Sequence, residues 1–349
     1  MEKNMIHVGI IGCGKIAQVR HLPEYAANQN CRICAVYDLN GVRAQQIAEQ
    51  YGAVACDSVE ALLAMPEIDA VSVCAANAAH AEITIAALKA GKHVLCEKPM
   101  AMTMADCERM VAATKQSGKY LMIGHNQRLT RAHSLAKKLI LQGEIGRIVT
   151  FRTEFSHCGP ETWSVDPGKN VWFFDKKKAV MGAMADLGIH KTDLIQFLTG
   201  QHVKSVMAYL GTLDKRDANG YLIGVDDNAV CIYEMDGGAV GTMTASWTNY
   251  ASECNATVLY GTEGVLHIYE DPKYAVVLEK KGGERALYAV DQIQTNDCQT
   301  KSGIIDLWID CLTQQKPPEI SGEEALYAMR AVFAAVESAE SGKKIQLED

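Results

Sequence analysis

The sequence has no long hydrophobic run and no excess of positive charge. No apolar stretch is long enough to span a membrane, and residues 1–5 lead into a strand-like segment without the apolar core of a signal peptide. We therefore expect a cytoplasmic protein. The net charge is −8, which argues against nucleic acid and anionic membranes as partners, because both attract basic surfaces.

The sequence also lacks the pattern of a disulfide framework, although it has twelve cysteines. Cys31 and Cys34 form a single C-x-x-C with no second pair, which is weak support for a zinc or redox site. Other cysteines lie in or beside apolar strand-like runs, where a thiol behaves as a small hydrophobic group: Cys13, Cys56, Cys74, Cys96 and Cys231. We expect reduced cysteines and no metal site.

The first motif that is present is a glycine-rich loop. The apolar run 6–11 leads into Gly12-Cys13-Gly14-Lys15-Ile16-Ala17, a G-x-G-x-x-A segment. In such a loop the first glycine permits a tight turn, the second lets the backbone approach a pyrophosphate, and the small third residue lets helix and strand pack. We predict that Gly12, Gly14, Lys15 and Ile16 bind a dinucleotide at a helix N-terminus.

An acidic residue follows at the expected distance. The strand-like run 33–37 ends at Asp38, 21 residues after Ala17, about where a ribose-binding carboxylate belongs. A carboxylate there accepts hydrogen bonds from ribose hydroxyls and repels a 2′-phosphate. We therefore predict NAD as the cofactor, with NADP less favoured. The alternative is a simple turn residue before Asn40-Gly41.

The alternation of strands and helices continues to about residue 125. Strands are predicted over 70–75, 94–98 and 120–123, and helices over 42–51, 58–64, 79–90 and 103–118. We count 120–123 as the sixth strand, although only five of the six have an assigned range. The pattern predicts an α/β Rossmann-type domain over 1–125, with a doubly wound parallel sheet.

The most informative of these strands ends in a charged pair and a proline. Val94-Leu95-Cys96-Glu97-Lys98-Pro99 predicts a buried parallel strand that stops at its carboxyl end, where open α/β sheets place ligands. Pro99 prevents the strand from continuing and restricts the backbone of Lys98. We predict that Lys98 is catalytic.

The pattern changes near residue 145, where strand-like runs begin to follow one another at hairpin spacing. They cover 148–155, 203–210, 228–234, 239–247, 255–260, 265–269 and 274–278. We predict an α+β C-terminal domain over 126–349 with a large, mostly antiparallel sheet. We expect this domain to bind substrate and to form an oligomer. Its last helix starts at a capping box, 321–324, runs to about 341 and is expected to pack back toward the first domain. Because no helix is assigned to one sheet face, we expect a homodimer or homotetramer.

One helix interrupts this sheet and carries acid–base side chains. The helix predicted over 186–198, closed by Gly200, places Asp186 and His190 four residues apart on one face, joined by Asp193. An Asp–His pair near a cofactor fits general acid–base chemistry. A metal pair and a purely structural histidine are the alternatives.

Together these motifs resemble the glucose–fructose oxidoreductase/inositol dehydrogenase (Gfo/Idh/MocA) family along nearly the whole chain. The resemblance is carried by Gly12-x-Gly14-x-x-Ala17, Asn77-x-x-His80, Glu97-Lys98-Pro99, Gly124-His125-Asn126-Gln127-Arg128 and Asp186-x-Gly188-x-His190-x-x-Asp193. It implies an enzyme that uses a nicotinamide cofactor to oxidise or reduce a secondary alcohol or carbonyl of a sugar, cyclitol or glycoside.

The resemblance also implies roles for individual residues. Lys98 would steady the charge on the reacting oxygen, His190 would take or give the hydroxyl proton, and Asp186 would hold neighbouring hydroxyls. Contacts to the cofactor would come from Asn77, His80, Glu97, Lys98 and Asn126, and further contacts to the substrate from Arg128, Trp163, Trp172 and His157.

The chain departs from the family pattern on the substrate side. Ala76 stands where proline is frequent, Met181-Gly182-Ala183 where three glycines are frequent, and Trp172 is followed by Phe173 instead of arginine. The substrate of another member is therefore not transferable. Stacking of Trp163, Trp172 and His157 on a sugar face remains an alternative to ordinary packing.

Two other functions are compatible with the same motifs. One is a redox-neutral enzyme that keeps NAD tightly bound, such as an epimerase or an enzyme of oxidative glycoside cleavage. The other is a non-catalytic regulator that senses a sugar or NAD, because a fold does not determine function.

Overall fold

A computed structural model describes residues 5–292 and 301–347 of the chain. These residues form two compact units, which we treat separately. The first contains residues 5–125, 163–166 and 301–326, and the second contains 126–162, 167–292 and 327–347. Among all of these, no helix combines the length and the apolar character that a membrane span requires.

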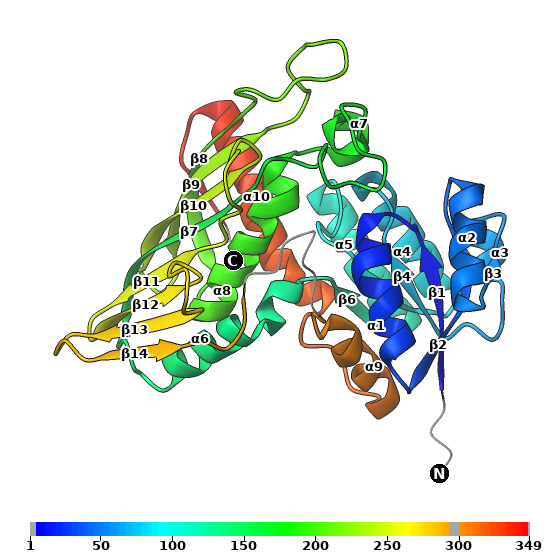
Figure 1. The fold of residues 1–349 in the computed structure, drawn as a ribbon, viewed down its shortest axis with the longest axis horizontal. Coiled ribbons are helices and arrows are strands. Elements are labelled where there is room, and N and C mark those ends of the chain that lie inside the picture. Colours follow the sequence, from blue (N-terminus) through cyan, green and yellow to red (C-terminus); the bar gives the residue numbers. More distant parts are fainter. Residues whose placement is uncertain (1–4, 293–300, 348–349) are drawn as a thin grey trace. The chain divides into compact units, whose positions relative to one another are not determined.

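The first unit is built on a sheet of six parallel strands, in the order β3-β2-β1-β4-β5-β6, as far as the described residues show (Figure 1). The winding direction reverses between β1 and β4, so the predicted doubly wound parallel sheet is confirmed. The sequence assigned no range to the two-residue strand β3, which is too short for a periodic pattern. The strands are β1 (Ile6–Ile11), β2 (Cys31–Tyr37), β3 (Val54–Ala55), β4 (Ala70–Val73), β5 (His93–Cys96) and β6 (Leu121–Ile123).

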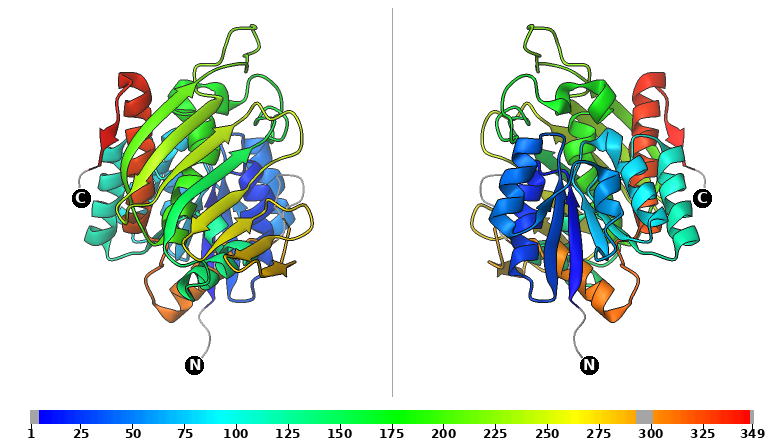
Figure 2. Two further views of the ribbon diagram at one scale, coloured as in Figure 1. Left: turned by 90° about the vertical axis from the view of Figure 1, so that its left-hand side faces the viewer. Right: turned by 90° about the vertical axis from the view of Figure 1, so that its right-hand side faces the viewer.

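Helices flank this sheet on both sides (Figures 1 and 2). Their ends follow local chemistry: the Thr103 hydroxyl accepts the Asp106 N–H at 3.1 Å to start α5, and Gly118 ends it in the left-handed conformation. The first helix begins with a π-helical turn, η1. The helical segments are η1 (Ala17–His21), α1 (Leu22–Ala27), α2 (Gly41–Tyr51), α3 (Val59–Leu63), η2 (Asn77–Ala79), α4 (His80–Lys89), α5 (Met104–Ser117) and α9 (Ile304–Gln314).

The second unit is built on a sheet of nine described strands, in the order β14-β13-β12-β11-β7-β10-β9-β8-β15. All neighbours pair antiparallel except β7 and β10, so the predicted large, mostly antiparallel sheet is confirmed. Two strands at the sheet edges, β14 and β15, had no predicted range. The strands are β7 (Ile148–Ser156), β8 (Val203–Gly211), β9 (Asn228–Met235), β10 (Val240–Ser246), β11 (Thr257–Gly261), β12 (Gly264–Ile268), β13 (Val276–Lys280), β14 (Arg285–Tyr288) and β15 (Ile345–Gln346).

Helices α6 and α8 contact one face of this sheet, and no described helix lies on the face turned to the viewer in Figure 2, left. Helix α8 ends at Gly200, as predicted, and α10 begins after Ser321, whose hydroxyl accepts the Glu324 N–H at 3.2 Å. The helical segments are η3 (Asn126–Leu129), α6 (Arg131–Leu141), η4 (Trp172–Phe174), α7 (Lys176–Ala179), η5 (Met184–Gly188), α8 (Ile189–Thr199) and α10 (Gly322–Ser341), the last of which has residues in both units.

The cysteines of the described residues are all free thiols. Cys31 and Cys34 lie three residues apart in strand β2, where positions i and i+3 point to opposite faces of the sheet. Cys31 is buried and Cys34 is partly exposed. Since the two thiols do not converge, this C-x-x-C segment is an ordinary part of the strand.

A buried histidine of helix α6 is expected to make the stability of the second unit depend on pH. His133 is fully buried, and its Nδ1 lies 2.8 Å from the Gln127 carbonyl oxygen. Burial, together with the charge of Lys191, lowers the pKa of His133 from 6.5 to about 3. The folded protein therefore keeps this ring neutral at a pH at which the unfolded chain binds a proton.

We expect the free energy of unfolding to fall as the pH drops from 6.5 toward 3, by up to roughly 1.4 kcal/mol per pH unit from this group alone. His133→Gln should lose less stability than the wild type between about pH 7 and pH 5, because it removes the proton uptake of the unfolded state. Urea unfolding at several pH values measures this. An identical pH dependence in both proteins would contradict the prediction.

Candidate functional site

The glycine loop follows strand β1 in the first unit. Gly12 has φ +94°, and a Cβ there would lie 2.6 Å from the carbonyl carbon of Cys74, so only glycine fits. A Cβ on Gly14 would meet no atom within 4 Å beyond its neighbours in the chain. The Gln18 N–H donates to the Gly14 carbonyl at 3.1 Å, so the helical turn begins at this loop, with Lys15 and Ile16 in it. The loop therefore has free space at the start of a helix, which suits a pyrophosphate.

Asp38 ties this loop to the end of strand β2. Its Oδ2 accepts the Cys13 N–H at 2.7 Å, and its Oδ1 accepts the Asn40 N–H at 2.8 Å. An arginine that sequence reasoning missed lies beside it: Arg43 has Nη1 3.6 Å from Asp38 Oδ1 and Nη2 2.6 Å from Asp166 Oδ2. The sequence signal that could have identified Arg43 was its position in the first turn of the helix that follows Asp38.

The ends of β4 and β5 carry the remaining predicted cofactor residues of the first unit. His80 bridges the two strand ends, because its ring nitrogens lie 2.8 Å from the Pro99 carbonyl oxygen and 3.0 Å from that of Ala75. Burial lowers the pKa of His80, despite these hydrogen bonds. Asn77 is buried in η2. Unit one thus gathers these side chains at the carboxyl edge of its sheet.

Glu97 and Lys98 differ in exposure at the end of β5. Glu97 is 4% exposed, whereas Lys98 is partly exposed and can contact a ligand. The peptide bond between Lys98 and Pro99 is cis. Unlike the Lys98 side chain, the Glu97 carboxylate faces the protein interior, where His21 Nε2 lies 2.9 Å from its Oε1.

In the second unit, Asp186 lies in a π-helical turn and His190 in the α-helix that continues it. Asp186 Oδ2 accepts the indole N–H of Trp247 at 3.1 Å and lies 3.6 Å from His157 Nε2. The ring centroid of Phe155 lies 6.0 Å from that of His157 and 6.0 Å from that of His190. The structure therefore brings Asp186, His157 and His190 into one neighbourhood, and it adds Trp247, which sequence reasoning missed because it is 61 positions from Asp186.

Arg128 and Asp193, which were predicted separately, form a forked ion pair. Arg128 Nε donates to Asp193 Oδ2 at 2.8 Å and Nη2 to Oδ1 at 2.6 Å, and both side chains are buried. Such bidentate pairs are strong and directional. The pair fastens η3, which also contains the buried Asn126, to helix α8.

A third missed residue, Asp226, holds the start of the helical segment. Its carboxylate accepts the N–H groups of Gly182 at 2.7 Å and Met184 at 2.8 Å, and its carbonyl accepts that of Ala183 at 2.8 Å. A Cβ on Gly182 would lie 1.9 Å from the Asp226 carbonyl oxygen. This contact explains why Met181-Gly182-Ala183 keeps glycine at its centre. Burial raises the pKa of Asp226, although these N–H groups oppose the shift.

The predicted aromatic residues differ in their contacts, although Phe173, the neighbour of Trp172, packs edge-on against Trp247 with ring centroids 6.4 Å apart. Trp172 stacks on Phe173 with centroids 3.9 Å apart, and His157 Nδ1 accepts the Gly159 N–H at 3.0 Å. Trp163 belongs with the short segment 163–166 of the first unit. Of the three, His157 lies beside Asp186.

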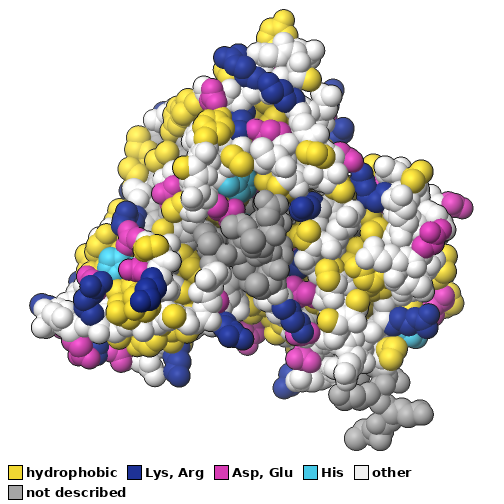
Figure 3. Space-filling view, in the orientation of Figure 1, with side chains coloured by type: hydrophobic (Ala, Val, Ile, Leu, Met, Phe, Trp, Pro, Cys, Tyr) yellow, Lys and Arg dark blue, Asp and Glu magenta, His cyan; other side chains and the backbone are white. Residues whose placement is uncertain are grey.

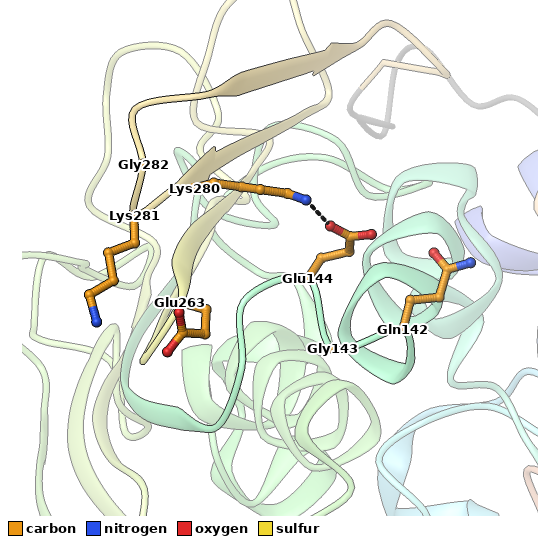
Figure 4. Close-up of a pocket in the computed structure, with 7 residues that line it drawn as sticks. All are labelled: Gln142, Gly143, Glu144, Glu263, Lys280, Lys281 and Gly282. Atoms are coloured by element: carbon orange, nitrogen blue, oxygen red, sulfur yellow. Dashed lines mark ion pairs between the residues drawn. The ribbon is translucent and has the colours of Figure 1, made fainter.

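A shallow hollow elsewhere in the second unit contains none of the predicted site residues (Figure 4). It has a volume of about 340 Å³, and Lys280 reaches across it to Glu144, with Nζ and Oε2 2.6 Å apart. Its lining is Gln142, Gly143, Glu144, Glu263, Lys280, Lys281 and Gly282. Within the described parts of the chain, no cluster of three or more His, Cys, Asp or Glu residues could hold a metal ion.

Comparison with known proteins agrees with this geometry. Residues 6–125 match the oxidoreductase family with an NAD-binding Rossmann fold, and residues 133–267 match the GFO/IDH/MocA C-terminal domain. The chain therefore belongs to the Gfo/Idh/MocA oxidoreductase family, and its first unit is an NAD-binding Rossmann domain.

Relatives of this chain include named dehydrogenases. It is 27% identical to a myo-inositol 2-dehydrogenase of Thermotoga maritima, with 99% of both chains covered. It is 28% identical to a D-glucoside 3-dehydrogenase of Escherichia coli, again over 99% of both. Among solved structures, a levoglucosan dehydrogenase in complex with NADH matches with a TM-score of 0.87 and 25% identity, covering 99% of each chain.

Proposed function

We propose that this protein is an NAD-dependent dehydrogenase that transfers hydride between nicotinamide and a secondary alcohol of a sugar, cyclitol or glycoside. The observation that carries the proposal is the similarity to two dehydrogenases of such compounds over 99% of their lengths. The simultaneous presence of Lys98, Asp186 and His190 supports an active enzyme over a regulator that only binds its ligands.

The first unit suits NAD by its own geometry. The open space at Gly14 admits a pyrophosphate, and Asp38 stands where it can accept hydrogen bonds from ribose hydroxyls. When bound, NAD⁺ supplies the hydride acceptor. We propose that further contacts come from Lys15, Ile16, Asn77, His80 and Asn126.

Three side chains of this chain would carry the remaining chemistry. As the substrate C–H bond breaks and the hydrogen leaves as hydride with both electrons, the hydroxyl proton passes to His190, and a C=O bond forms. The ammonium group of Lys98 stabilises the negative charge that builds on the oxygen. Asp186, oriented by Trp247, accepts hydrogen bonds from neighbouring hydroxyls.

A panel of polyols, inositols and glycosides tests the proposal. Purified protein mixed with NAD⁺ and each compound should produce NADH, seen by its absorbance, with at least one of them. Binding of a sugar and NAD⁺ without turnover of any compound would favour the regulator. Release of NAD from the purified protein only on denaturation would favour the redox-neutral enzyme.

Cofactor choice depends on Asp38. We expect Asp38→Asn to shift the ratio of kcat/KM for NAD over NADP by at least about tenfold, or about 1.4 kcal/mol, toward NADP. The carboxylate no longer repels a 2′-phosphate, and Arg43, 3.6 Å away, gains an anionic partner. The exposed Asp57→Asn is a matched control. Steady-state kinetics with both cofactors measures the ratio, and an unchanged ratio in Asp38→Asn would contradict the assignment of Asp38.

We further propose that residues 1–125 bind the cofactor, that residues 126–349 bind substrate and form an oligomer, and that the protein works in the cytoplasm. The free thiols of the described residues support a reducing compartment. The uncovered face of the second-unit sheet supports a homodimer or homotetramer. Hydrophobic side chains lie along the margin over β8 and β9 in Figure 3.

Four large apolar side chains on this sheet face are between 46% and 53% exposed: Met207, Tyr209, Val230 and Ile232. Met207 pairs with Ile232 and Tyr209 with Val230 across β8 and β9, so they form one patch. We expect Ile232→Glu to convert the oligomer to monomers in light scattering, because a charge would be buried in the interface. Lys204→Glu, at the start of β8, is the control. A wild-type protein that is monomeric at high concentration would contradict the oligomer proposal.

A further inference from the structure

A buried chain of hydrogen bonds runs beneath the end of strand β5 in the first unit. His21 Nε2 lies 2.9 Å from Glu97 Oε1, and His21 Nδ1 lies 3.2 Å from the Ser72 hydroxyl. The hydroxyl of Tyr25 lies 2.7 Å from that of Ser72. His21, Ser72 and Tyr25 have no exposed surface. The chain thus joins the first helix, strand β4 and strand β5 through polar groups alone.

The same carboxylate also binds the backbone of the proposed catalytic lysine. Glu97 Oε2 accepts the Lys98 N–H at 3.2 Å, so its two oxygens are shared between His21 and Lys98. A Cβ on Gly124 would lie 3.1 Å from this carboxyl group, so a glycine there leaves room for it. The Glu97 side chain is therefore enclosed by His21, the backbone of Lys98 and Gly124.

Glu97 is ionised in this setting. Burial alone would raise its pKa, but the hydrogen bond from His21 and the positive charges around it lower the pKa to about 2. One of these charges is Arg20, whose Nη1 is 3.9 Å from Glu97 Oε1. A buried carboxylate requires such partners, because an unpaired buried charge is costly. His21 is thus a direct stabiliser of the charged form of Glu97.

Donors and acceptors can be matched along the whole chain with a proton on His21 Nε2. That N–H donates to Glu97, and the Ser72 hydroxyl links His21 Nδ1 to the Tyr25 hydroxyl. The π-helical turn Ala17–His21 contributes to this geometry. Its wider turn brings Arg20 and His21, two consecutive residues, into the vicinity of Glu97.

We propose that His21 is a positioning residue: it fixes the Glu97 carboxylate, and Glu97 in turn fixes the backbone of Lys98. Glu97 then acts on Lys98 from the protein side instead of contacting the nicotinamide. This inference rests on the proposed function of Lys98 at the reacting oxygen. A shift of the lysine by about 1 Å can cost about 10²-fold in rate, so the expected effect is on turnover.

Two single variants and their combination distinguish these roles. We expect His21→Leu and Glu97→Gln each to lower kcat by about 10²-fold, and the double variant to be no slower than the slower single one, because both act through one path. The Kd of NADH, measured by fluorescence titration, should stay within about twofold of the wild type. His7→Leu, in strand β1 of the same unit, is the matched control and should retain its kcat.

The opposite pattern would overturn the inference. If Glu97→Gln weakens NADH binding by about tenfold or more while His21→Leu keeps its kcat, Glu97 is a cofactor ligand and His21 has no positioning role. If His21→Leu does not fold, Ser72→Ala decides together with Glu97→Gln. Slower turnover in both with unchanged NADH binding supports the inference, and wild-type kcat in Ser72→Ala overturns it.

Lys98→Ala separates this inference from the proposed function. Normal turnover by Lys98→Ala would refute the role of Lys98, whatever His21 does. Loss of turnover in Lys98→Ala with full activity in His21→Leu would refute the positioning role alone.

Discussion

Lys98→Ala should lower kcat by about 10³-fold or more and leave the Kd of NADH nearly unchanged. The oxygen of the substrate gains negative charge as hydride leaves, and a fixed ammonium group stabilises that charge more than it stabilises the neutral hydroxyl. Lys98 is partly exposed at the carboxyl end of β5, whereas Glu97 next to it is buried. The side chain is therefore available to a ligand, and its removal affects the transition state more than the bound cofactor.

The measurement is steady-state kinetics with the best compound of the polyol panel, together with NADH titration. Lys89→Ala removes an exposed lysine from α4 of the same unit and serves as the matched control. Full activity in Lys98→Ala would show that the negative charge on the substrate oxygen is stabilised without this residue. The proposed mechanism would then be wrong.

His190→Gln should lower kcat in the oxidation direction by 10²- to 10⁴-fold, roughly the contribution of a general base. Glutamine keeps hydrogen-bonding groups but cannot take up the hydroxyl proton. The wild-type kcat/KM should therefore rise with pH as a base loses its proton, and this rise should disappear in the variant. Rate profiles over several pH values measure both effects.

His202→Gln is the control, since His202 belongs to the same unit and stacks on Tyr327 with ring centroids 3.7 Å apart. A pH profile of His190→Gln that keeps the wild-type shape would assign the base to another group. His157, 3.6 Å from Asp186, would then be the next candidate to substitute.

Local patterns were sufficient wherever a site depends on neighbours in the chain. The turn at Gly12, the start of the helix at Gly14 and the acid at the end of β2 all follow one strand–loop–helix–strand unit. The same holds for the capped ends of α5, α8 and α10. In each case backbone geometry and hydrogen bonds within a few residues decide the structure, so the sequence expresses them directly.

Partners that are distant in the chain were not predictable. His21 meets Glu97 across 76 positions, Trp247 meets Asp186 across 61, and Asp226 meets Gly182 across 44. No period or spacing signals these contacts, because they arise only when separate elements pack. The π-helical turns at Ala17–His21 and Met184–Gly188 were likewise not among the predicted elements.

The sequence by itself therefore determined the parallel sheet with its glycine loop and Asp38, the antiparallel second sheet, and the two stretches that carry Lys98, Asp186 and His190. The tertiary structure alone decided what surrounds those side chains: Glu97 turned inward to His21, Arg128 paired with Asp193, and Asp226 bonded to the N–H groups where η5 begins. The physical reason is that strands, turns and caps depend on short-range geometry, whereas the partner of a buried charge depends on which elements enclose it.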